Sequence, residues 1–186
     1  MADPEHGKIL YLKRRTGCHG RHAWGDGPKE IPALAGQHEL YLLQQLARFA
    51  ARVRDSSLMR ESIHPAVVDR PQALRDLAAY LSAAPRSPSS GHGGGRARGV
   101  GERIYLQRCI ACHGQSGQGN EPSAVPAIGG QHYYYVVHRL QGFADSHPGE
   151  SESDVLSAAA GLSAEDRAGL ADYISRLPAL AAAGAR

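Results

Sequence analysis

The feature that most constrains this chain is an internal repeat. When the sequence is shifted by 94 positions, residues 7–50 align with residues 101–144 without a gap, and 18 of the 44 pairs are identical. At a shift of 93, further identities relate residues 77–85 to residues 170–178. A unit that recurs in this way predicts two copies of one small domain that arose by duplication.

Composition sets the boundaries of the two copies. Residues 85–98 are rich in Ser, Gly, Pro and Arg and hold no large apolar side chain, which predicts a flexible linker. Domain 1 then spans residues 1–84 and domain 2 spans residues 99–186. Domains of this size are marginally stable unless a disulfide, a metal or a cofactor fills the centre.

The spacing of apolar residues predicts helices in both copies. In the first copy it indicates a short helix over residues 7–14, an amphipathic helix over 38–50 and a last helix over 72–82 that ends before Pro85. Loops rich in Gly and Pro separate them, and neither copy shows the alternation of a strand. We therefore predict an all-α fold of two tandem helical domains.

Charge and hydropathy exclude several classes of protein. Lys and Arg number 12 against 9 Asp and Glu in domain 1, and 6 against 9 in domain 2, while the linker adds three Arg. This asymmetry is too weak for a nucleic-acid surface, although it can orient a protein partner or be ordinary solvated surface. No run approaches the roughly 20 apolar residues of a membrane span. The first 20 residues show no signal-peptide core.

The strongest functional motif is Cys-x-x-Cys-His at residues 109–113. Two thiols three positions apart on one helical turn can each add to a haem vinyl group, and His113 then serves as axial iron ligand. A zinc site would need a second ligand pair, and Cys18 is the one other thiol. A redox dithiol would need a βαβ setting. The motif predicts one haem c, held by Cys109, Cys112 and His113.

The first copy departs from this motif, because Arg15 stands where the second copy has Cys109. Cys18 and His19 remain, so haem attached by one thioether, haem held without a covalent bond and no haem are all open, with the first preferred. Met59 favours haem, because a thioether 40 residues after His19 suits the other axial position. The alternative is that Met59 is an ordinary core or surface methionine.

The second copy has the opposite defect, since no methionine occurs in residues 145–160. The usual ligand position falls near Val155. His147 is a candidate sixth ligand and His138 a weaker one, but a vacant or weakly held sixth position is preferred.

Other residues repeat at positions that suit support of the axial histidines. Pro32 and Pro126 each follow the motif histidine by 13 residues, so their carbonyls can accept the proton of the far ring nitrogen; the alternative is a simple loop proline. His38 and His132 open the amphipathic helices, and we interpret them as helix-start or haem-edge residues rather than ligands. Residues 133–135, three tyrosines, suit packing, haem propionates or the domain interface.

These residues together resemble the tandem di-haem class I c-type cytochromes of the cytochrome c4 kind. The resemblance rests on CIACHGQSGQG at 109–119, PALAGQHELYLLQQLARF at 32–49, PAIGGQHYYYVVHRLQGF at 126–143 and LSAEDRAGLADYISRL at 162–177. It implies a periplasmic electron carrier with two helical haem domains. It also implies attachment and ligation by Cys18, His19 and Met59 in domain 1 and by Cys109, Cys112 and His113 in domain 2. Arg15 and the missing second methionine depart from the family.

Three functions follow as hypotheses. The preferred one is electron transfer between redox protein partners through c-type haem, without catalysis by the chain itself. The second is the di-haem subunit of a dehydrogenase, such as the flavocytochrome type that oxidises sulfide. The third is a ligand-binding or sensor haem protein that uses an open sixth position in domain 2.

Overall fold

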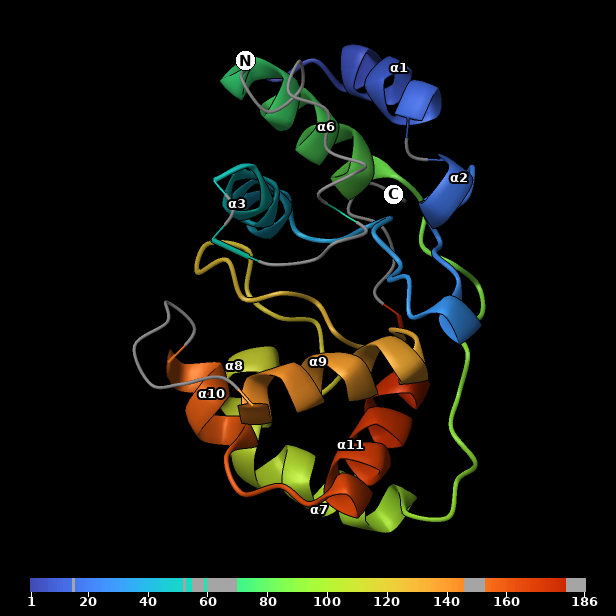
Figure 1. Cartoon of the computed structure of the whole chain (residues 1–186), viewed down its shortest axis with the longest axis vertical. Helices are drawn as coiled ribbons and strands as arrows, with labels where there is room; N and C mark the ends of the chain where they lie inside the picture. The colour runs from blue at the N-terminus through green and yellow to red at the C-terminus, as the bar shows by residue number, and fades with distance from the viewer. Residues whose placement is uncertain (15, 52, 55–58, 60–69, 146–152, 180–186) are drawn as a thin grey trace.

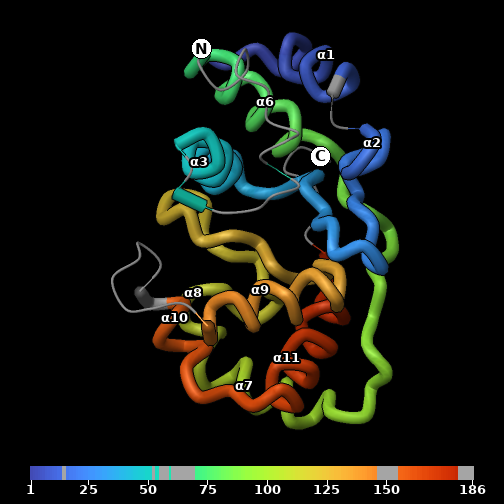
Figure 2. Tube along the Cα trace, viewed as in Figure 1, coloured from blue at the N-terminus to red at the C-terminus, as the bar shows by residue number. Residues whose placement is uncertain are grey.

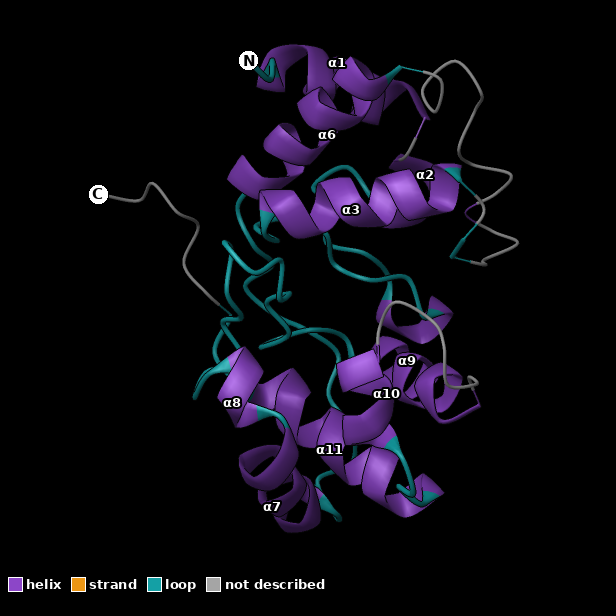
Figure 3. Cartoon of the chain, turned by 90° about the vertical axis from the view of Figure 1, so that its left-hand side faces the viewer, coloured by secondary structure: helices purple, strands orange, loops and turns teal. Residues whose placement is uncertain are grey.

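The computed structural model describes residues 1–14, 16–51, 53, 54, 59, 70–145 and 153–179. The helices gather in two groups at opposite ends of the long axis, and loops fill the space between them (Figures 1 and 3). Within the described ranges the secondary structure is helical, apart from two isolated bridges, Asp26 with Ile31 and Asn120 with Val125. The prediction of an all-α fold with two tandem domains is confirmed.

The first group holds the helices of domain 1. They are α1 (Pro4–Arg14), α2 (Thr16–His19), the 3-10 turn η1 (Gly27–Lys29), α3 (Glu39–Ala50) and α6 (Pro71–Ala83). Helix α6 packs against both α1 and α3. Pro71 occupies the first turn of α6, where its missing N–H costs no helical hydrogen bond.

The second group repeats this arrangement in domain 2. It consists of α7 (Arg98–Arg108), α8 (Ile110–His113), α9 (Tyr133–Asp145), α10 (Ser153–Ala159) and α11 (Ala164–Arg176). Helix α11 packs against α7 and α9 as α6 packs against α1 and α3. Ser163 and Asp166 form a capping box at the start of α11, which satisfies otherwise unpaired backbone N–H groups.

A glycine lets the first and last helices of each domain cross closely. A Cβ atom on Gly7 of α1 would lie 2.0 Å from the carbonyl oxygen of Asp76 in α6, and one on Gly101 of α7 would lie 1.9 Å from that of Gly169 in α11. Any larger residue would therefore push the helices apart.

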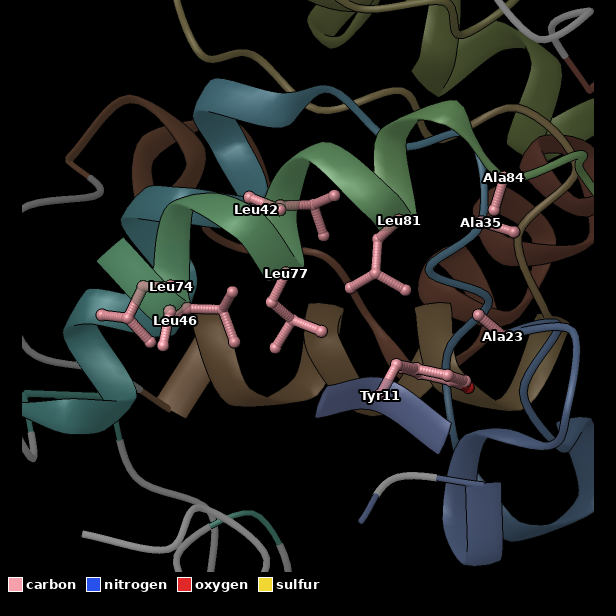
Figure 4. Close-up of a cluster of buried hydrophobic side chains, with 11 residues drawn as sticks. Tyr11, Ala23, Ala35, Leu42, Leu46, Leu74, Leu77, Leu81 and Ala84 are labelled. Carbon is pink, nitrogen blue, oxygen red and sulfur yellow. The ribbon is translucent and has the colours of Figure 1, made fainter. Parts of the chain in front are cut away.

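Each domain has a separate apolar core. In domain 1, leucines of α3 and α6 form one buried cluster with Tyr11, and Figure 4 shows Leu42, Leu46, Leu77 and Leu81 in this cluster. In domain 2, Tyr105 occupies the equivalent position and packs with Leu170 and Ile174. In both, the α1 or α7 tyrosine is fully buried and contacts a tyrosine of the last helix, Tyr80 or Tyr173.

The segment between the domains runs along one side of the chain from α6 to α7 (Figure 2). It lacks large apolar anchors, as the sequence indicated, but polar contacts attach it. The Arg86 guanidinium donates to the carbonyls of Gly36 in domain 1 and Gly129 in domain 2, both at 3.1 Å. Arg176 donates to the Gly93 carbonyl at 2.8 Å. These bonds fasten the segment to both domains.

No helix in the described part of the chain is long and apolar enough to cross a membrane.

We expect Gly101→Ala to destabilise the protein by about 1–3 kcal/mol, because its Cβ would overlap the Gly169 carbonyl. Gly99→Ala is the matched control, since Gly99 lies in the same helix with nothing within 4 Å of its Cβ position, and it should be neutral or stabilising by up to about 1 kcal/mol. Urea unfolding measures both. Equal effects of the two substitutions would show that the crossing is not close-packed.

Candidate functional site

The Cys-x-x-Cys-His motif of domain 2 lies at the junction of two helices. Cys109 stands between α7 and α8 and caps both helices, and the His113 N–H donates to the Cys109 carbonyl at 2.9 Å. One helical turn thus separates the two thiols. Cys112 is exposed, whereas Cys109 is half-buried, and this burial raises the pKa of the Cys109 thiol to about 11.

His113 has a ring orientation suited to metal ligation. Its Nδ1 lies 3.1 Å from the Pro126 carbonyl oxygen. Because a carbonyl oxygen can only accept, Nδ1 carries the proton, and a neutral ring leaves its lone pair on Nε2. Burial lowers the pKa of His113, which favours this neutral form. The side chain therefore offers Nε2 as a ligand atom.

Domain 1 repeats the same geometry around His19. Its Nδ1 lies 3.2 Å from the Pro32 carbonyl oxygen, and the residue is buried, with 5% of its surface exposed. Cys18 stands on α2 next to it and is exposed. Arg15 lies outside the described residues. The hydrogen bond expected from the 13-residue spacing is thus present in both domains.

A shared loop brings each proline carbonyl to its histidine. The loop folds back where the Gly25 N–H donates to the His19 carbonyl at 3.0 Å and, in domain 2, the Gly119 N–H donates to the His113 carbonyl at 2.9 Å. Both glycines have positive φ, 77° and 70°. A Cβ on Gly25 would also lie 2.6 Å from the Pro32 carbonyl oxygen, so only glycine suits this turn.

A buried tyrosine fixes the opposite end of each loop. Tyr11 donates its hydroxyl proton to the Gly20 carbonyl, and Tyr105 donates to the Gly114 carbonyl, both at 2.6 Å. Burial raises the pKa of Tyr105 to about 12, so this hydroxyl stays a donor at neutral pH. The residue after each motif histidine is thereby tied to the core.

The candidate sixth ligands are described only in part. Met59 is helical and half-buried, and its part in ligation stays a prediction. His147 lies outside the described residues. Val155, at the position expected for a second methionine, is half-buried in α10.

The histidines that open α3 and α9 bridge the domains. His132 donates from Nε2 to the Trp24 carbonyl at 2.7 Å and accepts at Nδ1 from the Gly91 N–H at 3.2 Å. His38 has the mirrored bond, from Nε2 to the Gln118 carbonyl at 2.7 Å, and its Nδ1 lies 2.7 Å from a Glu121 carboxylate oxygen. Both rings are thus engaged on both sides, which suits helix-start residues rather than iron ligands.

Tyr135 and His138 of α9 also contact domain 1. His138 pairs with Glu30 at 3.1 Å, and the Tyr135 hydroxyl accepts from the Arg54 guanidinium at 3.2 Å. Of the three interpretations offered for the tyrosines, the domain interface applies to Tyr135.

Gln37 and Gln131 join the two domains, a role that the motifs of the sequence do not reveal. Each side chain hydrogen-bonds the backbone of an alanine in the opposite domain, Gln37 with Ala127 and Gln131 with Ala33. Their identity across the repeat was a visible indication, but their partners lie 90 and 98 residues away along the chain.

Comparisons with known proteins match this geometry. The family model for cytochrome c matches residues 100–178. Over 176 residues the chain is 31% identical to cytochrome c4 of Azotobacter vinelandii, covering 86% of this chain and 82% of that protein. The crystal structure of reduced recombinant cytochrome c4 from Pseudomonas stutzeri is similar with a TM-score of 0.83 and 29% identity, covering 96% of this chain and 100% of that one.

A further relative is named as the electron acceptor of a dehydrogenase. The thiosulfate dehydrogenase electron acceptor of Stutzerimonas stutzeri (strain A1501) is 28% identical over 170 residues, covering 86% of this chain and 77% of that protein.

In haem-free protein at pH 8, we expect iodoacetamide to alkylate Cys18 and Cys112 well before Cys109. A pKa of about 11 leaves roughly one Cys109 thiol in a thousand as the reactive thiolate at that pH, and the fraction grows as the pH rises towards 11. Peptide mass spectrometry of timed samples measures the three rates. Equal rates at pH 8 would contradict the burial of Cys109.

Proposed function

The chain belongs to the cytochrome c4 family and transfers single electrons by means of c-type haem, and we propose that it does so through two haems, one in each domain. The observation that carries this proposal is the repeated ligand geometry. In each domain a histidine of the attachment motif donates its Nδ1 proton to a proline carbonyl, at 3.2 Å in domain 1 and 3.1 Å in domain 2. Haem, when bound, supplies the one-electron redox chemistry.

In domain 2 every part of an attachment site is present. The thiols of Cys109 and Cys112 would form the two thioether bonds, and His113 would ligate through Nε2. The Pro126 carbonyl fixes the ring and increases its basicity, which influences the midpoint potential. Because Cys109 is half-buried, its thioether bond would lie partly inside the domain.

In domain 1 the site would hold haem by a single thioether at Cys18. His19 is more deeply buried than His113 and keeps the same proton donation to a carbonyl, here that of Pro32. This orientation of the His19 ring is the one that haem ligation would require, and it supports haem in domain 1. Met59 would complete the coordination, which raises the potential of His/Met haems.

Redox proteins are the partners that this function requires. Domain 1 is basic and domain 2 acidic, so the chain can orient a partner by its charge asymmetry. The relative named as an electron acceptor of thiosulfate dehydrogenase supports a catalytic partner of the dehydrogenase class. Haem attachment of this kind and the family resemblance support a periplasmic location.

A second function, binding of a small ligand at the domain 2 haem, is favoured by the distribution of candidate ligands. The chain has two methionines, Met1 and Met59, and neither is in domain 2. His132 is engaged through both nitrogens, and His138 pairs with Glu30 of the other domain. His147 is the remaining histidine candidate. Without it, the sixth position of this haem would be open to carbon monoxide or nitric oxide.

Haem counting tests the main proposal. Protein matured in a periplasm should carry two haems per chain by intact mass and pyridine haemochrome, and it should be reduced and reoxidised reversibly. Cys18→Ala should lose one covalently bound haem, whereas the haem on Cys109 and Cys112 stays. If the wild-type mass contains a single haem, and the haem count is the same in Cys18→Ala, then domain 1 carries no covalently bound haem and the proposal fails.

A carbon monoxide difference spectrum of the reduced protein tests the second function. An open sixth position in domain 2 gives a spectral shift that saturates at one ligand per chain. The variant His147→Ala distinguishes the alternatives, because a shift that occurs only in this variant shows that His147 ligates the iron. No shift in either protein rejects the ligand-binding function.

A further inference from the structure

Each axial-histidine candidate is connected to the opposite domain through a single peptide group. The peptide between Pro126 and Ala127 accepts the His113 proton at its carbonyl, at 3.1 Å. Its N–H donates to the side-chain oxygen Oε1 of Gln37, in domain 1, at 2.9 Å. The two hydrogen bonds thus act on opposite ends of one amide.

Domain 1 contains the same relay in mirror image. The Pro32 carbonyl accepts from His19 at 3.2 Å, and the N–H of the same peptide, that of Ala33, donates to Oε1 of Gln131, in domain 2, at 2.9 Å. The relays therefore cross, since each runs from a histidine in one domain to a glutamine in the other.

The orientation of both glutamines is fixed by their surroundings. Oε1 of Gln37 also accepts the His38 N–H at 2.9 Å, and its Nε2 donates to the Ala127 carbonyl at 2.8 Å. Gln131 has the same set, from the His132 N–H and to the Ala33 carbonyl, both at 2.9 Å. A flipped amide would face two N–H donors with its own NH₂ group, so the oxygen must point at the peptide N–H.

We propose that Gln37 and Gln131 are positioning residues that lower the midpoint potential of the haem in the opposite domain, acting through the Pro-Ala peptide and the axial histidine. The inference rests on the proposed function, because it requires haem iron on His113 and, for the second relay, on His19.

The sign follows from the polarisation of the peptide group. An acceptor on the N–H of an amide shifts electron density towards its carbonyl oxygen, which strengthens the hydrogen bond that this oxygen accepts. A stronger bond from Nδ1–H makes the imidazole a more basic ligand, and a more basic ligand stabilises ferric iron over ferrous iron. Each glutamine therefore disfavours reduction of the haem across the interface.

Burial makes the two relays unequal. Gln37 and Ala127 are 7% and 3% exposed, whereas Gln131 and Ala33 are both half-buried. Hydrogen bonds polarise one another more strongly where water is excluded. The effect of Gln37 on domain 2 should thus exceed that of Gln131 on domain 1.

The test is a redox titration of the holoprotein and of Gln37→Leu, followed by NMR so that the two haems are resolved. We expect the potential of the domain 2 haem to rise, with the ratio of reduced to oxidised haem changing about twofold to threefold, or roughly 18 to 28 mV for one electron. The domain 1 haem should keep its potential. Gln131→Leu should give the reverse pattern with a smaller shift.

Two further variants separate the relay from simple loosening of the interface. His38→Leu removes the two interdomain contacts of the His38 ring, with the Gln118 carbonyl and the Glu121 carboxylate. Neither contact touches the Pro126–Ala127 peptide, so both potentials should stay unchanged. In Gln37→Glu, the protonated carboxyl offers an acceptor and a donor in the same places, and at a pH low enough to protonate it the wild-type potential should return. This variant also serves if Gln37→Leu does not fold.

The outcomes distinguish failure of the relay from failure of the proposed function. Loosening would admit water to the site and favour charged ferric iron, which lowers the potential, so a fall after Gln37→Leu overturns the inference. A shift confined to the domain 1 haem, or no shift in a sample that contains haem, also overturns it. A sample without haem on His113 would instead reject the proposed function, and haem is therefore counted in the same sample first.

Discussion

The hydrogen bond that each motif histidine donates to a proline carbonyl is the interaction on which the rest of the structure depends. It sets the tautomer of the ring, with the proton on Nδ1. The bond requires a loop that returns to the histidine after 13 residues, and this loop in turn requires Gly25 or Gly119 at its turn and Tyr11 or Tyr105 at its base. The tyrosine then needs the close crossing of the first and last helices, which Gly7 and Gly101 allow. The packing of the helices therefore helps to set the position of the motif histidine.

The two domains meet through the same loops that hold the ligands. Five or six residues after Pro32 or Pro126 stand two glutamines and two histidines, which all bond the backbone of the opposite domain: Gln37, His38, Gln131 and His132. The interface contacts therefore lie within two hydrogen bonds of His19 and His113. The mutual orientation of the domains and the setting of these two histidines are thus not independent.

Much of this could be predicted from the sequence, because local patterns determine it. The predicted helices over 38–50 and 72–82 differ from α3 and α6 by one residue at some ends, and the 13-residue spacing indicated both histidine-proline bonds. The backbone partners of Gln37, His38 and Arg86 could not be predicted, because they lie far away along the chain and a backbone group leaves no mark in a sequence. The anchoring of the linker could not be predicted for the same reason, because the Arg86 and Arg176 side chains hold it through bonds with backbone carbonyls.

The glutamines recognise backbone atoms, and this has a consequence for the history of the chain. A side chain that binds a peptide group makes no demand on the side chain at that position, so the glutamine contacts need only the two glutamines and an unobstructed chain path at the alanines. After duplication, the side chains at those backbone positions could change without loss of these contacts. The halves differ at Arg15, where the other half has Cys109, and near Val155, where the other half has Met59, and neither difference touches the peptide groups that the glutamines bind.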